Sequence, residues 1–261
     1  MVGPKVLVLR TAGTNCDYET EYAFQIAGAE TALIHINHLI TGRANLDEYH
    51  ILALPGGFSY GDDVAAGILL ANEIKHKLGD LLRDFVDSGK LIIGICNGFQ
   101  VLVRAGLLPG LNSQTVQEAT LALNTSAKFE CRWVRLETQD TSCAFTHGLK
   151  QRIYLPIAHA EGRFTAPNQI LDALESNRQV VFRYVAPDGE PPLYPDNPNG
   201  SDLQIAGICD PTGRIFGMMP HPERFLTRLN HPHWTREHLP EKGDGFNIFQ
   251  NAVTFVRQNF S

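Results

Sequence analysis

One short stretch of this chain fixes how its backbone must turn. Residues 91–93, Leu-Ile-Ile, form an apolar run typical of a buried strand, and the next five residues are Gly-Ile-Cys-Asn-Gly. Glycines on both sides of the cysteine allow a strand and a following helix to cross closely, at a turn that larger side chains would block. The pattern therefore predicts a buried strand, a sharp turn that carries Cys96, and a helix directly behind it.

At such a turn, Cys96 lies at the carboxyl end of the strand and at the amino end of the helix. The partial positive charge of a helix amino terminus stabilises a thiolate, which is the nucleophilic form of cysteine. The motif is thus the cysteine version of a nucleophile elbow. The alternative is a buried structural cysteine, and this stretch by itself does not decide between the two.

Apolar segments alternate with helix-like segments through the first half of the chain. The apolar segments predict strands at 5–10, 31–36, 51–54 and 91–95. Amphipathic spacing predicts helices at 18–27, within 65–85 and from 98 onward. This alternation indicates the α/β class, with a mostly parallel sheet, flanking helices and right-handed crossovers. Because functional loops follow the carboxyl ends of such strands, we expect three glycine-bearing loops to converge there: 11–17, 55–67 and 94–98.

The second half of the chain has a different pattern. Segments 204–209 and 214–219 flank Asp-Pro-Thr-Gly, a strong turn signal, and predict an antiparallel hairpin near the carboxyl terminus. The remaining predictions are strands at 128–137 and 179–185, a loop at 187–201 and a terminal helix at 247–257. No linker interrupts the sequence, so we expect one domain over residues 1–261.

Composition excludes several classes of protein. The chain has 261 residues, 43% of them hydrophobic, and a net charge of -6 with Lys and Arg scattered, which argues against a nucleic-acid surface. No apolar run approaches the ~20 residues of a membrane span, and the start of the chain lacks a secretory pattern. Five cysteines without a Cys-x-x-Cys pair predict reduced, mostly buried thiols in a cytoplasmic protein. Asp62 and Asp63 lack a third ligand at a supporting spacing, so we expect solvated acids there and no metal site.

Two His-x-Glu tripeptides compete as partners of the cysteine. The first is residues 159–161, behind an apolar run, and the second is residues 221–223, His-Pro-Glu. A residue before proline is pushed toward an extended conformation, in which positions two apart face the same side, so Glu223 can orient the ring of His221. Either histidine can act as the base of a Cys-His-Glu triad, and spacing alone does not choose between them.

A Pro-Gly-Gly sequence at 55–57 follows the predicted strand 51–54. In isolation it indicates an ordinary strand-end turn. Beside an elbow on a neighbouring strand, the backbone N–H of Gly57 and that of Asn97, directly after the cysteine, can form an oxyanion hole.

Together these stretches resemble the class I glutamine amidotransferases. Within that class, the chain resembles the glutaminase subunits of phosphoribosylformylglycinamidine synthase, which serve purine biosynthesis. The stretches that carry the resemblance keep the family's order over nearly the whole chain: 13–17, 55–62, 94–100, 158–164, 197–201 and 218–224. A segment at about 227–245 forms a longer tail than compact members of the family have.

The resemblance implies a flavodoxin-like sheet and a glutaminase mechanism. It assigns the catalytic triad to Cys96, His221 and Glu223, with a γ-glutamyl thioester on the cysteine. It thereby selects between the two histidines, which spacing alone does not.

The resemblance also assigns the remaining site residues and the partner. Gly57 and Asn97 supply the oxyanion hole, and Gln100 and His159 lie at the glutamine-binding pocket. No cofactor or metal is expected on this chain, because ATP and Mg²⁺ are used by a separate large synthase subunit that receives the ammonia. The resemblance leaves open whether a small third subunit joins, and it implies neither nucleic acid nor membrane as a partner.

Two other functions remain open on the residues alone. One is a stand-alone hydrolase with a cysteine elbow, such as a peptidase or γ-glutamyl hydrolase, which would need no partner. The other is a binding or regulatory module that keeps the fold, although no member of the triad is missing from this sequence.

Overall fold

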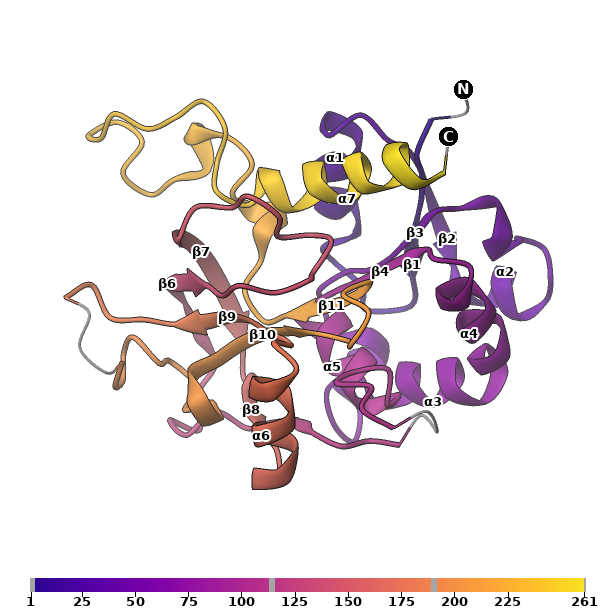
Figure 1. Cartoon of the computed structure of the whole chain (residues 1–261), viewed down its shortest axis with the longest axis horizontal. Helices are drawn as coiled ribbons and strands as arrows, with labels where there is room; N and C mark the ends of the chain where they lie inside the picture. The colour runs from indigo at the N-terminus through magenta and orange to yellow at the C-terminus, as the bar shows by residue number, and fades with distance from the viewer. Residues whose placement is uncertain (1–2, 113–115, 189–191, 261) are drawn as a thin grey trace.

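A computed structural model describes residues 3–112, 116–188 and 192–260 of the chain. Its centre is a nine-stranded sheet in the order β2-β1-β3-β4-β11-β10-β9-β6-β7, and Figure 1 shows this sheet between two layers of helices. The first five strands in that order pair in parallel. They are β2 (Glu30–His35), β1 (Lys5–Arg10), β3 (Ile51–Leu54), β4 (Leu91–Ile95) and β11 (Ile215–Met218).

The helices of the parallel half lie on both faces of the sheet. Figure 1 shows α1 and α7 on one face and α3 and α5 on the other, with α2 and α4 toward the β2 edge. Their bounds are α1 (Asp17–Ile26), α2 (Ile36–Ile40), α3 (Ile68–Lys77), α4 (Gly79–Asp87), α5 (Asn97–Arg104) and α7 (Phe246–Asn259). The predicted α/β class, the strands of the first half and the terminal helix are confirmed.

The turn between β4 and α5 has the close crossing that its glycines predict. All five residues of β4 are buried. A Cβ atom on Gly98 would lie 1.9 Å from the carbonyl oxygen of Leu54, and one on Gly94 would lie 2.6 Å from the carbonyl oxygen of Gly98. Neither contact leaves room for a side chain, so both glycines are required for α5 to pack onto β3 and β4.

The predicted hairpin is also present. Strands β10 (Ile205–Cys209) and β11 pair antiparallel, with Gly207 opposite Met218. The turn between them is held by Asp210, whose carboxylate accepts the backbone N–H groups of Arg214 and Ile215 at 2.9 and 2.8 Å. Short Asp-based turns of this kind satisfy backbone donors locally, which fixes the hairpin register.

The antiparallel part of the sheet extends well beyond the hairpin. It continues through β9 (Val180–Tyr184), β6 (Glu130–Thr138) and β7 (Arg152–His159), all antiparallel neighbours. Strand β7 is missing from the sequence-based predictions, although its residues alternate between buried and accessible as in a half-buried strand. Helix α6 (Asn168–Ser176) and the pair β5 (Thr120–Ala122) and β8 (Arg163–Thr165) complete this half.

The predicted loop 187–201 is largely buried at its carboxyl end, and its residues 189–191 lie outside the described residues. Asn199 is fully buried, and its amide donates to the carbonyl of Gly162 at 2.8 Å and to the hydroxyl of Tyr184 at 3.1 Å. The loop therefore fastens the segment after β7 to β9.

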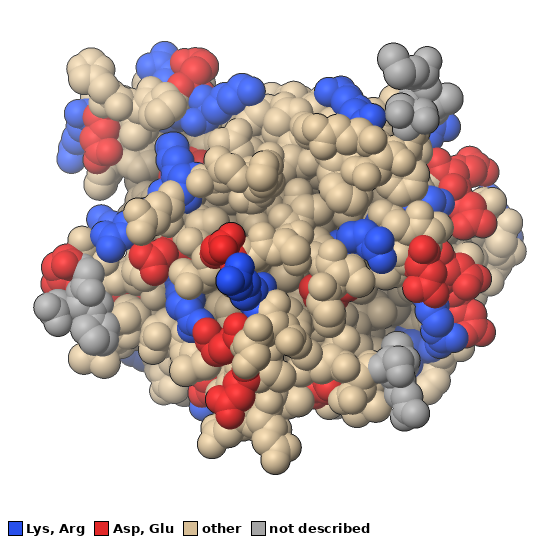
Figure 2. Space-filling view, viewed as in Figure 1, with Lys and Arg blue, Asp and Glu red and all other residues tan. Residues whose placement is uncertain are grey.

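The surface agrees with the scattered charge of the sequence. On the face shown in Figure 2, the described Lys and Arg side chains are interspersed with Asp and Glu, and acidic side chains gather toward the right edge. Among the described residues, no helix combines the length and the apolar character needed to cross a bilayer.

Candidate active site

Cys96 occupies the turn between β4 and α5 in a strained backbone conformation. Its φ and ψ are 52° and -105°, in a region that a residue with a side chain adopts only when the surroundings enforce it. Its N–H donates to the carbonyl of Met218 at 2.8 Å, which ties the turn to β11. The thiol is 5% exposed and lies 3.6 Å from the carbonyl oxygen of Ala158, at the end of β7. Cys96 is thus presented where the parallel and antiparallel halves of the sheet meet.

His221 and Glu223 form a buried pair just beyond β11. Nδ1 of His221 donates to Oε1 of Glu223 at 2.6 Å, and the two side chains are 2% and 0% exposed. The N–H of His221 donates to the carbonyl of Pro156 in β7 at 2.8 Å, so the unpredicted strand positions the imidazole. His221 is extended, as a residue before proline should be, but residues Pro222–Arg224 form a 3₁₀ turn. Glu223 therefore reaches the ring through a turn, not through the extended chain that the sequence predicts.

The surroundings of His221 favour its charged form. Burial by itself would lower the pKa of the ring, but the Glu223 carboxylate, the Cys96 thiol and the Cys16 thiol outweigh burial and raise the pKa well above its usual value. Nε2 is buried and has no hydrogen-bond partner among the described residues. The imidazole can therefore stay protonated at neutral pH and stabilise a neighbouring thiolate, with Nε2 free to exchange a proton.

His159, at the end of β7, is in the opposite state. Its Nδ1 lies 3.2 Å from Oδ1 of Asn124, a neutral amide, and the side chain is 2% exposed. Burial, with a smaller contribution from the charge of His221, lowers the pKa of His159 to about 3. Glu161 does not pair with this ring, because its carboxylate lies 3.3 Å from the guanidinium of Arg104. The first His-x-Glu is therefore not a histidine–carboxylate pair.

The Gly56–Gly57 peptide is fixed in one orientation. The carbonyl of Gly56 accepts the N–H groups of Asn15 and Cys16 at 3.4 and 3.2 Å. In a trans peptide the N–H points away from the carbonyl, so the N–H of Gly57 faces away from this loop, and it has no acceptor among the described residues. Gly57 lines the same cavity as Cys96. Its φ of 144°, and the 2.8 Å that a Cβ would leave to the nitrogen of Asn15, exclude any side chain.

Asn97 is the first residue of α5, so its backbone N–H has no partner within the helix. Its side chain joins the loop 55–67 to the helix. Oδ1 accepts the N–H of Ser59 at 3.2 Å, and Nδ2 donates to Asp62 at 3.2 Å and to Gln100 at 3.0 Å. The predicted convergence of the three glycine-bearing loops is thus confirmed by direct contacts.

A cavity of about 40 Å³ adjoins the Cys96 thiol. Its lining includes the predicted glutamine-binding residues Gln100 and His159 and two carboxylates, Asp62 and Glu161. Gln100 donates from Nε2 to the carbonyl of Glu161 at 2.6 Å. Asp62 is not a solvated acid, which corrects the prediction, because it is half-buried and burial raises its pKa. Asp63 is exposed, as predicted.

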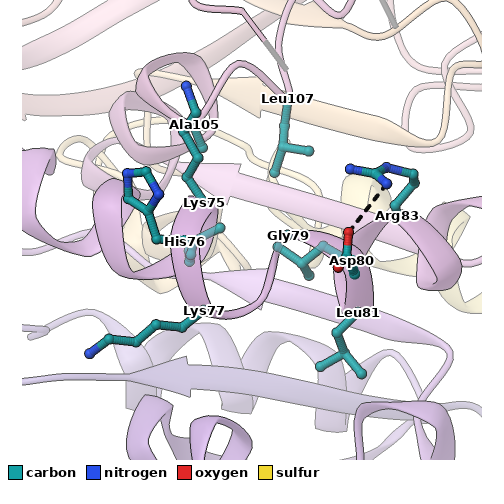
Figure 3. Close-up of a pocket in the computed structure, with 11 residues that line it drawn as sticks. Lys75, His76, Lys77, Gly79, Asp80, Leu81, Arg83, Ala105 and Leu107 are labelled. Atoms are coloured by element: carbon teal, nitrogen blue, oxygen red, sulfur yellow. Dashed lines mark ion pairs between the residues drawn. The ribbon is translucent and has the colours of Figure 1, made fainter. Parts of the chain in front are cut away.

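A larger cavity, of about 160 Å³, lies elsewhere. It is formed by the end of α3, the start of α4 and the residues after α5, and Figure 3 shows its charged side chains, including the Asp80–Arg83 ion pair of 3.2 Å. Neither a thiol nor a member of the candidate triad lines it. Its size therefore does not make it the site of chemistry.

The sequence gives no role to two residues that contact the His221–Glu223 pair. Cys16 is 1% exposed, and its sulfur accepts a hydrogen bond from the Arg224 guanidinium at 3.0 Å. The sequence indicates these two residues only by their positions. Arg224 directly follows Glu223, and Cys16 lies in the predicted loop 11–17. The prediction of mostly buried thiols holds for Cys143 and Cys209, whereas Cys131 is exposed.

The comparisons with known proteins agree with the resemblance. The family model described as the CobB/CobQ-like glutamine amidotransferase domain matches residues 3–256. Phosphoribosylformylglycinamidine synthase subunit PurQ of Dehalococcoides mccartyi is 51% identical over 97% of this chain and 98% of its own length. The subunit of the same name from Methanococcus maripaludis is 47% identical over 98% of this chain and 99% of its own length.

A solved structure is similar over the same length. One chain of the structure of PurLQS from Thermotoga maritima superposes with a TM-score of 0.75 at 32% identity, covering 97% of this chain and 99% of that chain. The resemblance inferred from the sequence motifs is thereby confirmed. The chain belongs to the CobB/CobQ-like glutamine amidotransferase family and, within it, to the PurQ subunits of phosphoribosylformylglycinamidine synthase.

Proposed function

We propose that Cys96, His221 and Glu223 form the catalytic triad of a glutaminase. The observation that carries this proposal is the buried 2.6 Å His221–Glu223 pair, whose free Nε2 lies in the electrostatic field of the Cys96 thiol. A carboxylate that accepts from Nδ1 fixes the tautomer and stabilises the imidazolium, as in other triads.

In the proposed reaction, the Cys96 thiolate attacks the side-chain amide carbon of glutamine. The N–H groups of Gly57 and Asn97 stabilise the negative charge that develops on the amide oxygen. Nε2 of His221 then donates its proton to the departing nitrogen. Ammonia is released, and a γ-glutamyl thioester remains on Cys96. Neutral His221 next accepts a proton from water, which attacks the thioester and releases glutamate and the thiolate.

The cavity beside Cys96 suits an amino-acid substrate. Asp62 and Glu161 line it, and their carboxylates can accept the α-ammonium group of glutamine. Gln100 and His159 line it as well, in support of their assignment to glutamine binding.

We further propose that the chain works as the glutaminase subunit of a larger synthase. The structural relative is a PurLQS assembly, and the similar chains are named as subunits of phosphoribosylformylglycinamidine synthase. The ammonia would pass to a large synthase subunit that uses ATP and Mg²⁺ to convert formylglycinamide ribonucleotide to formylglycinamidine ribonucleotide. A small subunit joins that assembly in this proposal.

Replacement of the nucleophile tests both parts of this proposal. Cys96→Ala should abolish glutamine-dependent synthesis and leave ammonia-dependent synthesis by the reconstituted complex intact, since ammonia enters after the thiol has acted. Cys143→Ala, which removes a buried thiol from the loop between β6 and β7, is the matched control and should retain both activities. Loss of the ammonia-dependent activity in a folded Cys96→Ala complex would instead give Cys96 a structural role. Full glutamate release by the variant would favour a different hydrolase chemistry.

The synthase is expected to gate the glutaminase. A single oxyanion donor is worth about 3 kcal/mol, so a small shift of the Gly57 N–H changes the rate by about a hundredfold or more. The Gly56 carbonyl is held by Asn15 and Cys16, so a partner that moves the loop at 13–16 would also move this N–H. We expect weak glutamate release by the isolated chain and strong stimulation by the synthase with its nucleotides. Equal turnover under all conditions would favour a stand-alone hydrolase.

A further inference from the structure

Two thiols act on the His221 imidazole. One is Cys96 at the elbow, and the other is Cys16 from the loop 11–17. A Cβ atom built on Gly56 would lie 3.2 Å from the Cys16 sulfur and 3.4 Å from Nδ1 of His221. The Cys16 sulfur, a ring nitrogen of His221 and a carboxylate oxygen of Glu223 all lie within 4.8 Å of one another. Cys16 therefore belongs to the immediate surroundings of the histidine–carboxylate pair.

The Cys16 sulfur accepts a hydrogen bond from a cation, whereas Oε2 of Glu223 accepts none from the described residues. Arg224 donates to the sulfur of Cys16 at 3.0 Å, while the thiol itself lies 3.2 Å from Oδ1 of Asn15. Oε2 of Glu223 is buried and accepts no hydrogen bond from the described residues. The charge of Arg224 interacts with the Glu223 carboxylate, but the guanidinium forms no hydrogen bond with Oε2. Here the cation is bonded to a sulfur instead.

We propose that Cys16 is a positioning residue, whose sulfur keeps the Arg224 guanidinium from a direct ion pair with Glu223, so that the carboxylate hydrogen-bonds to His221 alone. This inference rests on the triad of the proposed function. If Arg224 turned to the free Oε2, it would neutralise part of the negative charge that stabilises the imidazolium. The thiolate–imidazolium pair would then persist over a narrower range of pH.

Other charged groups near the ring do not take over this role. His159, at the end of β7, interacts with His221 but is neutral, because burial lowers its pKa to about 3. Glu19 acts on Arg224 from α1 but does not contribute to the pKa shift of His221, and Asp17 pairs with Arg10 at 2.5 Å. Arg224 is therefore the cation that can compete with His221 for Glu223 in this part of the described structure.

The position of Cys16 has a second consequence. Its backbone N–H donates to the carbonyl of Gly56 at 3.2 Å, which fixes the peptide that carries the proposed oxyanion donor. Cys16 thus contacts both the His221–Glu223 pair, which activates the nucleophile, and the Gly56–Gly57 peptide, which stabilises the oxyanion. A side-chain substitution separates these two tasks, because it leaves the backbone hydrogen bond in place.

The pH profile of kcat/KM for glutamate release, measured on the full chain in complex with the synthase, tests this role. The alkaline limb reports loss of the His221 proton. Cys16→Ala should lower kcat/KM about tenfold and move the alkaline limb down by about one pH unit. The tenfold figure is the lower end of the effect seen when a residue that orients a metal-binding histidine is replaced. Cys16→Ser, whose hydroxyl still accepts from Arg224, should keep the limb near its original position.

A second substitution identifies the cause. Cys16→Ala/Arg224→Met removes the cation, so the alkaline limb should return toward that of the unaltered chain. Cys143→Ala, which loses a buried thiol away from the triad, should change neither rate nor limb. If Cys16→Ala does not fold, Cys16→Val fills the space without an acceptor and repeats the test.

The outcomes separate this inference from the proposed function. An unchanged alkaline limb in folded Cys16→Ala, or no recovery in the double variant, overturns the role of Cys16 while Cys96→Ala remains inactive. Glutamate release by Cys96→Ala in the same series would overturn the triad itself, and the role of Cys16 with it.

Discussion

Residues 159–161 and 221–223 both read His-x-Glu, and both lie near the end of a strand in the same sheet, yet their imidazoles are in opposite states. His221 donates to a buried carboxylate, which helps to raise its pKa well above the usual value. His159 contacts a neutral amide, and burial lowers its pKa to about 3.

The difference arises from the local backbone. At the second site the chain turns into a 3₁₀ helix after His221, which brings Glu223 back to the ring. At the first site the strand ends at His159, and Glu161 points to Arg104 and to the loop at 66 instead. Identical spacing therefore gives His221 a carboxylate partner and leaves His159 a neutral residue that lines the cavity.

The largest effect should come from His221→Ala. Loss of the base of a triad costs up to about 10⁶-fold in kcat, because the nucleophile and the leaving group both lose their proton-transfer partner. Steady-state glutamate release by the complex measures it, with ammonia-dependent synthesis as the control for folding and assembly. A loss of only a few fold would remove His221 from the triad.

Glu223→Gln should cost somewhat less, about 10⁴-fold, as removal of the acidic member does in other triads. The charge of the carboxylate determines in which direction the pH profile of kcat/KM should shift. The carboxylate raises the pKa of His221, so its removal lowers that pKa, and the imidazolium is lost at a lower pH. The alkaline limb of kcat/KM should move down. A limb that stayed in place would show that the carboxylate does not set the charge of His221.

His159→Ala should mainly weaken glutamine binding. The ring lines the cavity but is neutral and has no carboxylate, so we expect KM to rise about fivefold, the equivalent of one ordinary contact, with kcat nearly unchanged. Separate determination of kcat and KM decides the point. If thioester formation stopped in this variant and survived in His221→Ala, the two histidines would exchange roles.

The smallest effect on turnover should come from Asn124→Asp, which gives His159 a carboxylate partner of its own. A negative charge beside the ring favours the charged form, so the pKa of His159 should rise from about 3. The variant also loses the amide N–H bonds to the carbonyls of Lys128 and His159, so the protein should be destabilised by about 1–3 kcal/mol. Titration of the ring by NMR measures the first effect, and thermal unfolding measures the second. A pKa that stayed near 3 would mean that burial alone governs this histidine.

Local patterns in the sequence predict much of this molecule. The glycine spacing around Cys96 predicts the elbow because the close crossing of strand and helix permits no Cβ at those positions. The turn at 210–213 predicts the hairpin because Asp210 satisfies its own neighbours. Both features are determined within a few residues, so they can be read without the rest of the fold.

The rest depends on contacts between distant parts of the chain. Arg224 and Cys16 are 208 positions apart, so no local pattern indicates their hydrogen bond. Spacing alone does not choose between the histidines, because the partner of His159 is Asn124, 35 positions away. Strand β7, which positions His221 through the carbonyl of Pro156, contains a proline that lowers its apparent strand character.

The protonation states of the two rings at neutral pH test the central comparison most directly. NMR of the full chain labelled with ¹⁵N-histidine distinguishes a ring that carries protons on both nitrogens from a neutral one, with His221→Ala and His159→Ala supplying the assignments. We predict that His221 is an imidazolium at pH 7 and that His159 is neutral down to strongly acidic pH. A neutral His221 beside a charged His159 would contradict the assignment of the two histidines.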